Sequence, residues 1–509
     1  MVDFKEFFMS EHISAEKLEQ LGADEYKKIE SKILDGSLTN KDRMAIPLQI
    51  MPTGEPKVRA RQMCEVALGY TKEQAIVEAN RCLQCKNKPC VSGCPVNVQI
   101  PDFIAQVAKG NFKEAVDIIK QTNLLPAICG RVCPQEKQCQ SQCTLGKVNK
   151  DVEKSVCIGR LERFVADYER NNNLTTTPTV APSTGKKVAV VGSGPAGLTV
   201  AADCRRAGHE VTVFEAFHKA GGVMVYGIPE FRLPKEIVAK EVENLKNMGV
   251  KFEMNTLVGR TATVQQILTE KGFDAAFVGT GAGLPKFFNI PGENYIGVFS
   301  ANEYLTRANL MKAYEKDKAD TPFYEAKTVV VCGGGNVAMD AARMALRLGA
   351  EKVYVVYRRT RAEMPARREE VDHAEEEGVE FRFLENPVEI LGSAEDGRVT
   401  GIRALTYELG EPDASGRRRP VEVKGSEHDI PCDAVIVALG NNSNPLIPRT
   451  TPDIKTDAHG HITVDEKQAT SMTKVWAGGD IVLGAATVIL AMGEGRKAAA
   501  SINEYLAQL

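Results

Sequence analysis

Two hydrophobic patterns divide the chain. Through residues 61–170, apolar residues recur every three or four positions, as in TKEQAIVEANRCLQC and CIGRLERFVADYE, and runs typical of strands are nearly absent. This spacing predicts amphipathic helices. From Lys186 onward, short β-rich runs alternate with helical stretches, which predicts parallel sheets covered by helices. The strand candidates are KKVAVVG, EVTVFE, DAAFVGTG, KTVVVCG, KVYVVYR, DAVIVALG and KVWAGGD.

Residues 1–60 are charged, and they predict one clear helix between a cap at Ser14 and an end at Gly36. A surface helix packed on its own domain is favoured over an arm that docks on a partner, because one stripe of this size is common on surface helices. Residues 171–186, NNNLTTTPTVAPSTGK, are polar and rich in Thr and Pro, which is typical of a linker. The stripe of the helix consists of Leu18, Leu21, Tyr26, Ile29 and Ile33.

A first glycine fingerprint, VAVVGSGPAGL, follows a strand candidate and opens a helix. Glycines at these positions let the backbone approach a pyrophosphate at the helix N-terminus, where amides and the helix dipole favour anions. Glu215 ends the next strand, at the distance where a carboxylate accepts hydrogen bonds from a ribose. The alternative is a tight strand–helix turn without a ligand. The fingerprint residues are Gly192, Gly194, Pro195, Ala196 and Gly197.

A second fingerprint, VVVCGGGNVAMDAA, is followed by a strand that ends in YRRTR. An acidic residue is expected at that strand end for NAD, but this chain has arginines, whose guanidinium groups suit a 2′-phosphate. The pattern therefore favours NADP(H), and a solvated basic turn is the alternative. The residues assigned to this site are Gly333, Gly335, Asn336, Val337, Ala338, Arg358, Arg359 and Arg361.

A third glycine-rich element lies near the C-terminus, in VWAGGDIVLGAATVILAMGEGRKAAASI. A strand ends in Gly-Gly-Asp, and a long helix of small residues follows after a turn. An aspartate at this position can bind a sugar or ribityl hydroxyl, and a helix start can face a polar ring edge. The alternative is a last strand and helix that only close the sheet.

Composition and charge narrow the class of protein. The chain has 509 residues, 43% hydrophobic and 26% charged, which predicts a soluble protein of about three domains. A net charge of -3 gives no indication of nucleic acid or an anionic membrane. The start, MVDFKEFFMSEH, is acidic where a signal peptide is basic, and no apolar run approaches the ~18 residues of a membrane span. We therefore expect a cytoplasmic protein.

The cysteines point to metal chemistry. Of thirteen cysteines, all but Cys204, Cys332 and Cys432 lie between Cys64 and Cys157. Two quartets, in CLQCKNKPCVSGCP and ICGRVCPQEKQCQSQC, each contain a Cys-Pro. Zinc is one possible occupant. Iron–sulfur is favoured, because each quartet contains a Cys-Pro and the quartets precede two dinucleotide fingerprints typical of redox domains, whereas zinc cannot accept electrons. In two-cluster ferredoxin runs the cysteine before a proline serves the other cluster, so Cys94 is expected to belong to a different cluster from Cys82, Cys85 and Cys90.

The dinucleotide fingerprints, the Gly-Gly-Asp and GTGAG at 279–283 together resemble the two-dinucleotide-domain flavoprotein reductases. The resemblance covers residues 186–509 and implies FAD on the first fingerprint and nicotinamide on the second. It also implies that Asp480 contacts the flavin ribityl chain. No cysteine pair accompanies this pattern, so thioredoxin-reductase-like activity is not expected. The further residues assigned to the FAD site are Gly222, Gly281, Gly479, Ala486, Thr487 and Val488.

The cysteine region, with the IGRLERF that follows, is similar to the two-cluster domain shared by the glutamate synthase small subunit, dihydropyrimidine dehydrogenase and the large subunit of NADH-dependent ferredoxin:NADP oxidoreductase. This resemblance implies that one [4Fe-4S] cluster is held by Cys82, Cys85, Cys90 and Cys143. It implies that the other is held by Cys94, Cys133, Cys139 and Glu162. Cys157 is the rival fourth ligand of the second cluster, and Cys129 is expected to be structural.

The resemblance also predicts the fold and the division of the chain. We expect an α/β protein in which an all-helical two-cluster domain precedes two Rossmann-like domains, with the NADP domain inserted in the FAD domain. The predicted boundaries are 1–60 for an N-terminal helical extension, 61–170 for the iron–sulfur domain, 171–186 for the linker, 187–300 and 441–509 for the FAD domain, and 301–440 for the NADP domain.

PKVRARQMCEVALGYT and KPCVSGCPVNVQIPDFI resemble the transhydrogenase branch, which implies hydride exchange between NADPH and FAD, with no protein residue strictly required as a catalyst. It implies flavin-based electron bifurcation, with ferredoxin and an NAD-linked redox subunit as partners in a hetero-oligomer. The alternatives are the glutamate synthase small subunit, a stand-alone sulfide or polysulfide reductase, and a docking subunit whose nicotinamide site is idle.

Overall fold

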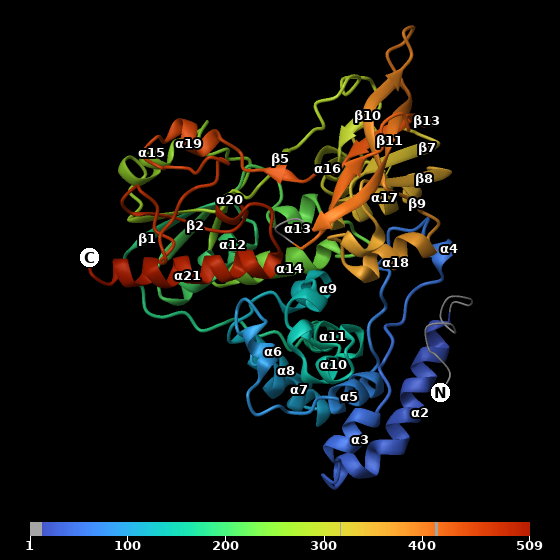
Figure 1. Ribbon diagram of the computed structural model, residues 1–509. Helices are drawn as coiled ribbons and strands as arrows, with labels where there is room; N and C mark the ends of the chain where they lie inside the picture. Colours follow the sequence, from blue (N-terminus) through green and yellow to red (C-terminus); the bar gives the residue numbers. More distant parts are fainter. Residues whose placement is uncertain (1–12, 316, 413–415) are drawn as a thin grey trace.

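The computed structural model describes residues 13–315, 317–412 and 416–509 (Figure 1). The acidic start of the chain, on which the expectation of no signal peptide rests, lies outside these residues. The described part begins with three helices, α2 (Ala15–Leu34), α3 (Asn40–Ala45) and α4 (Pro56–Arg59). None of the described helices is both long enough and apolar enough to cross a membrane.

Helix α2 packs on the domain that follows it. The Ser14 hydroxyl accepts the Lys17 amide at 3.4 Å, which confirms the predicted cap. The helix contacts α5, so the interpretation as a packed surface helix is confirmed. The assignment of Leu21 to the buried stripe is wrong, because Leu21 is 53% exposed. Gly22 takes its place on the buried face, where a Cβ would lie 2.4 Å from the Gln74 side chain.

The cysteine-rich part of the chain is helical, as predicted. Its longest element is α11 (Ile158–Asn171), which packs on α8 and α9. Phe112 of α8 holds the helices together, because its ring meets those of Phe164 and Tyr168 edge-on at 4.9 and 5.0 Å. The described residues between 72 and 171 contain no strand. The other helices are α5 (Lys72–Asn80), α6 (Pro89–Ser92), α7 (Ile100–Ala108), α8 (Phe112–Lys120), α9 (Pro126–Val132) and α10 (Thr144–Val148), with short 3₁₀ turns at Gln135–Lys137, Gln140–Gln142 and Val152–Lys154.

The first parallel sheet joins segments from both ends of the α/β region. Its strand order is β16-β4-β1-β2-β3, so the strand nearest the C-terminus pairs with one from before the second fingerprint. Helices α12 (Pro195–Arg206) and α21 (Val488–Leu506) pack against one another beside it. The strands are β1 (Lys187–Val191), β2 (Glu210–Phe214), β3 (Lys251–Glu253), β4 (Ala275–Val278) and β16 (Val475–Ala477).

The second parallel sheet, in the order β6-β14-β7-β8-β9, lies wholly between β4 and β16 in the chain. This placement confirms the predicted insertion of one dinucleotide fold in the other. Its strands are β6 (Val298–Ser300), β7 (Thr328–Cys332), β8 (Lys352–Tyr357), β9 (Glu380–Phe383) and β14 (Ala434–Val437), and its helices are α16 (Ala301–Asn309), α17 (Asn336–Arg347) and α18 (Arg368–Glu376).

An antiparallel sheet beside the second parallel sheet has no counterpart in the sequence-based prediction. It comprises β10 (Glu385–Gly392), β11 (Val399–Pro412), β12 (Arg418–Glu422) and β13 (His428–Pro431). These strands are buried on one face only and carry many polar residues, so they lack the continuous apolar runs by which the parallel strands are recognised. The remaining short elements are α13 (Val223–Tyr226), α14 (Lys235–Asn247), α15 (Val264–Thr269), α19 (Leu446–Thr450), α20 (Asp480–Leu483), β5 (Leu284–Pro285) and β15 (Asn441–Asn442).

Candidate cofactor sites

The first fingerprint forms a turn that only glycine fits. Gly192 ends β1 with φ +99°, and a Cβ there would lie 2.5 Å from the Gly279 carbonyl oxygen. A Cβ on Gly197 would lie 2.0 Å from the Gly192 carbonyl oxygen, so α12 can press against the strand. Gly194 has no atom within 4 Å of its Cβ position. This open position at the start of α12, before Pro195 and Ala196, fits a pyrophosphate.

Glu215 is held at the end of β2, beside this turn. It is buried, and its carboxylate accepts hydrogen bonds from the Ser193 amide at 3.0 Å and from the Phe217 amide at 2.8 Å. The Ser193 hydroxyl donates to it as well, at 2.5 Å, so one of the about four lone-pair sites of a carboxylate remains for a ribose hydroxyl. Gly222, with φ +56°, brings its loop over the turn, since a Cβ there would lie 2.8 Å from the Gly194 Cα.

The C-terminal Gly-Gly-Asp lies beside the first fingerprint turn. Gly479 has φ +77°, and its Cβ position lies 3.0 Å from the Cβ of Ala196 on α12. Asp480 follows, and burial raises its pKa to about 6. Its Oδ1 accepts the Ala486 amide at 3.3 Å, while Thr487 caps α21. Val488 is the first, buried residue of that helix, and Gly281, with φ +71°, has open space at its Cβ position. The chain therefore gathers a phosphate turn, the buried Glu215, the partly buried Asp480 and a helix start around one site.

The second fingerprint repeats the geometry at the end of β7. A Cβ on Gly333, with φ +149°, would lie 2.4 Å from the Ala438 carbonyl oxygen. Gly335 precedes α17, and the nearest atom to its Cβ position is 3.9 Å away. The Asn336 side chain accepts the Arg367 amide at 2.9 Å. Val337 is 39% exposed at the helix start, and Ala338 is fully buried.

The structure separates the three arginines assigned to a 2′-phosphate. Arg359 is buried and donates from Nε to the Arg418 carbonyl at 2.7 Å. Arg361 forms ion pairs with Asp372, at 2.5 Å, and with Glu375. Arg358 is exposed at the end of β8. Arg358 and Arg361 are thus both exposed, but Arg361 already pairs with two carboxylates, and the assignment of the three arginines to a 2′-phosphate stays a prediction.

One cavity in the helical domain is lined by Cys82, Cys85, Cys90 and Cys143. Burial raises the pKa of Cys82 to about 11 and that of Cys90 to about 12, so both are protonated thiols at neutral pH. A metal cluster that binds them must displace those protons. Leu83, Pro101, Ile104 and Leu145 form an apolar part of the wall, where Cys85 donates to the Thr144 hydroxyl at 3.1 Å.

A second cavity is lined by Cys94, Cys133, Cys139 and Glu162, with Cys129 as a further thiol. Burial raises the pKa of Glu162 to about 8, and its Oε1 accepts the Asn123 side-chain amide at 2.6 Å. The two thiol sets expected for separate clusters are therefore each brought to a cavity of their own. Among the described residues, no three or more His, Cys, Asp or Glu side chains lie close enough together to hold a single metal ion.

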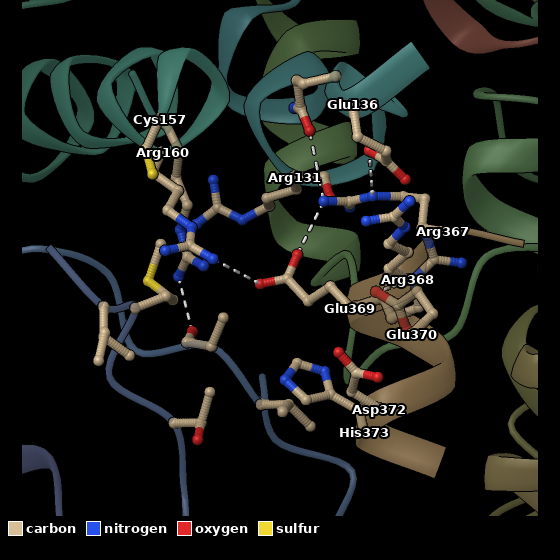
Figure 2. A pocket seen from close by; sticks show the side chains of 18 of the residues that line it. Arg131, Glu136, Cys157, Arg160, Arg367, Arg368, Glu369, Glu370, Asp372 and His373 are labelled. Carbon is tan, nitrogen blue, oxygen red and sulfur yellow. Dashed lines mark hydrogen bonds and ion pairs between the residues drawn. The ribbon is translucent and has the colours of Figure 1, made fainter. Parts of the chain in front are cut away.

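Cys157, the rival ligand, faces elsewhere. It lines a cavity of about 500 Å³ between the helical domain and α18, and it is absent from the wall of the Glu162 cavity (Figure 2). On the far side of this interdomain cavity, Glu369 lies 3.6 Å from the Arg160 guanidinium. The Arg367 guanidinium donates to the Arg131 carbonyl at 2.7 Å and so ties α18 to α9.

The two thiol cavities adjoin one another, and one of them lies nearer to α21 than the other. Ile100 and Ile158 line both cavities. Ile489 of α21 lines the Glu162 cavity, whereas no residue of α21 lines the Cys82 cavity. The Glu162 cavity is therefore the nearer one to the helix that starts beside Asp480.

Sequence reasoning missed one residue of the Glu162 cavity, Asn123. Cys129, which belongs to the second cysteine quartet and is expected from the sequence to be structural, also lines this cavity. Nothing in the sequence marked Asn123, which reaches Glu162 from outside α11.

The fold and these sites define an NADP(H)-dependent flavin iron–sulfur oxidoreductase, whose cofactors are FAD, NADP(H) and two [4Fe-4S] clusters. Residues 59–174 match the family described as dihydropyrimidine dehydrogenase domain II, 4Fe-4S cluster, and residues 186–495 match the pyridine nucleotide-disulphide oxidoreductases. The chain belongs to the pyridine nucleotide-disulphide oxidoreductase family, in the branch with this N-terminal cluster domain that includes the glutamate synthase small chain.

Known proteins match this chain over different shares of their length. The chain is 39% identical over 455 residues to the glutamate synthase [NADPH] small chain of Halomonas elongata, covering 88% of this chain and 94% of that protein. It is 41% identical over 444 residues to the NADP(+)-dependent formate dehydrogenase subunit beta of Moorella thermoacetica, covering 82% of this chain but only 60% of that longer protein. FprA from Mycobacterium tuberculosis in complex with NADPH shares the fold, with a TM-score of 0.53 at 19% identity over 64% of this chain and 85% of FprA.

Proposed function

We propose that this chain is the NADP(H)-linked subunit of a larger electron-transfer complex, which exchanges electrons between NADPH and one-electron carriers. When bound, FAD and NADP(H) supply hydride transfer and the two clusters supply single-electron transfer. The chain holds FAD with the turn at Gly192–Gly197, Glu215 and Asp480. It holds NADP(H) with the turn at Gly333–Ala338 and Arg358. Its protein groups set geometry and exclude water, and no side chain is needed as an acid or base.

The main support for this proposal is the spatial order of α21, the Glu162 cavity and the Cys82 cavity. The Glu162 cavity lies against α21, and the Cys82 cavity adjoins it on the other side through Ile100 and Ile158. We assign Cys94, Cys133, Cys139 and Glu162 to the cluster nearer the flavin site, and Cys82, Cys85, Cys90 and Cys143 to the outer one. Electrons from the flavin site then have a route that ends near the surface of the helical domain.

The surface beside the outer cavity is basic. The Cys85 thiol lies 3.1 Å from the Thr144 hydroxyl, which brings the segment after Cys85 next to α10. Lys86 follows Cys85, and Lys147 and Lys150 lie in or just after α10; all three are exposed. Val148, 56% exposed, lies among them. Because the whole chain carries a net charge of -3, this basic surface is local and suits an acidic carrier such as ferredoxin.

The finer proposal is an NADPH/NAD/ferredoxin transhydrogenase that bifurcates electrons at the flavin. In it, a second, NAD-linked redox subunit takes one electron of each pair and ferredoxin takes the other. Two relatives have names that mark them as subunits, the formate dehydrogenase subunit beta and the NADPH-Fe(3+) oxidoreductase subunit beta of Geobacter sulfurreducens, and these names support a hetero-oligomer.

Anaerobic purification from the native cell tests the proposal. The complex should contain a second redox subunit, and NADPH should reduce ferredoxin substantially only when NAD is also present. Lys86→Glu with Lys147→Glu should slow ferredoxin reduction while NADPH still bleaches the flavin at the wild-type rate. Lys455→Glu, an exposed lysine of the FAD domain, is the matched control. Ferredoxin reduction that is independent of NAD would reject bifurcation, and an unaffected double variant would reject the docking surface.

A second candidate is the small chain of a glutamate synthase. The relative from Halomonas elongata favours it, because the alignment covers 94% of that protein. Under this proposal the chain would co-purify with a large glutaminase-type subunit, and the complex would oxidise NADPH in the presence of glutamine and 2-oxoglutarate. Absence of that activity together with NAD-dependent ferredoxin reduction decides for the transhydrogenase.

A further inference from the structure

The Glu162 cavity offers more ligands than one cluster needs. Four protein donors complete a [4Fe-4S] cluster, yet four thiols and a carboxylate line this wall. Cys129 is the additional donor. It lies on α9, one turn before Cys133, the C-cap residue of that helix, whose amide donates to the Cys129 carbonyl at 3.1 Å. Cys129 is 1% exposed and Cys133 6%.

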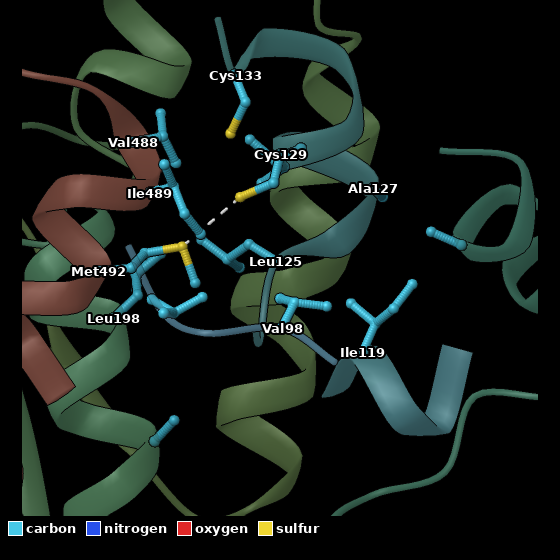
Figure 3. Close-up of a cluster of buried hydrophobic side chains, with 14 of the residues drawn as sticks. Val98, Ile119, Leu125, Ala127, Cys129, Cys133, Leu198, Val488, Ile489 and Met492 are labelled. Carbon is cyan, nitrogen blue, oxygen red and sulfur yellow. Dashed lines mark hydrogen bonds between the residues drawn. The ribbon is translucent and has the colours of Figure 1, made fainter. Parts of the chain in front are cut away.

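Cys129 is held by specific contacts. Its thiol donates to the Asn123 side-chain oxygen at 3.7 Å and lies 3.8 Å from the Met492 sulfur of α21. Figure 3 shows the Cys129 and Cys133 sulfurs on the same side of α9, facing α21. The Gln135 side-chain amide donates to the Cys129 carbonyl at 3.3 Å and fixes the backbone there.

Asn123 connects the thiol with the carboxylate. Its side-chain oxygen accepts the Leu125 amide at 2.9 Å as well as the Cys129 thiol. Its side-chain nitrogen donates to Glu162 Oε1 at 2.6 Å. The Leu125 amide needs an acceptor, which sets the orientation of the carboxamide. One buried side chain therefore touches both Glu162 and Cys129.

We propose that Cys129 is a reserve ligand of this cluster, held as a thiol by Asn123 while Glu162 occupies the fourth position. When the carboxylate is removed, the Cys129 sulfur binds the iron that Glu162 leaves. In a chain without the carboxylate, the Fe–O bond is absent; the S–H bond of Cys129 breaks, one Fe–S bond forms, the proton is released to solvent, and no electron is gained or lost. The inference rests on the proposed role of Glu162 and adds a function to a cysteine that the family resemblance leaves without one.

Three variants test this inference: Glu162→Ala, Cys129→Ala and the double variant. Each is purified anaerobically and characterised by iron content, by EPR of the reduced protein and by FAD content. Glu162→Ala should keep about eight irons per chain, the content of two [4Fe-4S] clusters, with a shifted EPR signal for one cluster. Cys129→Ala should match the wild type. The double variant should lose that cluster while the signal of the Cys82 cluster and the FAD content persist.

Glu162→Ala with Cys157→Ala is the matched control, because Cys157 is a buried cysteine close to Glu162 in sequence but lines the interdomain cavity. It should behave like Glu162→Ala alone. If the double variant with Cys129 does not fold, iron X-ray absorption of Glu162→Ala replaces it, and the number of sulfur neighbours per iron should rise.

The outcomes separate the two assignments. An unchanged EPR spectrum in Glu162→Ala would overturn the role of Glu162 itself. A double variant with the same iron content and spectrum as Glu162→Ala would overturn the reserve ligand and leave Glu162 in place. Loss of the cluster in Cys129→Ala alone would also overturn it, since Cys129 would then be a resident ligand.

Discussion

The side-chain amide of Gln138 donates a hydrogen bond to the hydroxyl of Thr487 at 3.3 Å. Gln138 precedes Cys139, a proposed cluster ligand, and Thr487 caps α21 beside Asp480. This bond joins the cluster domain to the helix that starts at the proposed flavin site, as does the bond from the Arg496 guanidinium to the Thr122 carbonyl at 2.8 Å farther along α21. The two regions are separated by most of the chain, so the contact exists only in the folded protein.

Gln138→Leu should slow the electron transfer from the flavin site to the clusters several-fold, because the position of Cys139 relative to α21 is no longer fixed. Flavin reduction by NADPH should keep its wild-type rate. Stopped-flow spectroscopy separates the two steps. Gln142→Leu is the control, since in the described part of the chain the Gln142 side chain bonds within its own domain, to Ser141 and Lys147. Equal slowing of both steps would contradict this prediction.

Glu162→Ala should alter the EPR signal of one cluster, whereas Cys157→Ala should alter neither. The reason is geometric, because Glu162 lines the cavity of Cys94, Cys133 and Cys139, and Cys157 lines a different cavity. EPR of the dithionite-reduced variants measures the effect. An altered EPR signal in Cys157→Ala would contradict this prediction and indicate that Cys157 is a ligand.

Arg358→Gln should raise the KM for NADPH about 10- to 100-fold and leave the KM for NADH unchanged. A hydrogen bond to a charged group contributes about 1.5–3 kcal/mol, and each 1.4 kcal/mol corresponds to about a tenfold change. Only NADPH carries the 2′-phosphate. Arg361→Gln is the control, because that guanidinium already pairs with Asp372 and Glu375. Steady-state kinetics with both nucleotides decides, and an equal loss for NADH would contradict the role of Arg358.

His373 should make the protein less stable in acid. Burial, with the Arg343 guanidinium nearby, lowers the pKa of His373 to about 4, from 6.5 when unfolded. The unfolded chain therefore binds the proton more readily, so the free energy of unfolding falls as the pH drops from about 6.5 to about 4 and levels off below that. At 1.36 kcal/mol per pKa unit, the loss reaches about 3 kcal/mol.

His373→Gln removes this contribution and leaves the other titrating groups in place. Thermal unfolding of the wild type and the variant between pH 4 and pH 7.5 provides the comparison. The stability difference between them should shift in favour of the variant as the pH falls. A difference that does not depend on pH would show that His373 is not buried in its neutral form.

The sequence predicted the parallel core of this protein well, because a strand buried on both faces is an uninterrupted apolar run. All seven strand candidates are strands in the structure, from β1 to β16. The antiparallel sheet β10–β13 was missed because one face of it is polar. Leu21 was assigned to a buried stripe because spacing alone cannot recognise that Gly22 admits the Gln74 side chain. The domain boundaries and ligand assignments stay predictions.

The sequence by itself determined the chemistry available to this protein. Its glycine fingerprints, Glu215, the YRRTR strand end and two cysteine quartets specify phosphate turns, a ribose acceptor and thiol ligands, since these depend on residue type and short spacing. The tertiary structure decided which groups meet. In the folded protein Cys157 and Glu162 line different cavities. Arg361 forms ion pairs with two carboxylates. Cys129 and Asn123 line the cavity of Glu162. These outcomes depend on how helices and loops far apart in the chain pack together, and no local pattern encodes such packing.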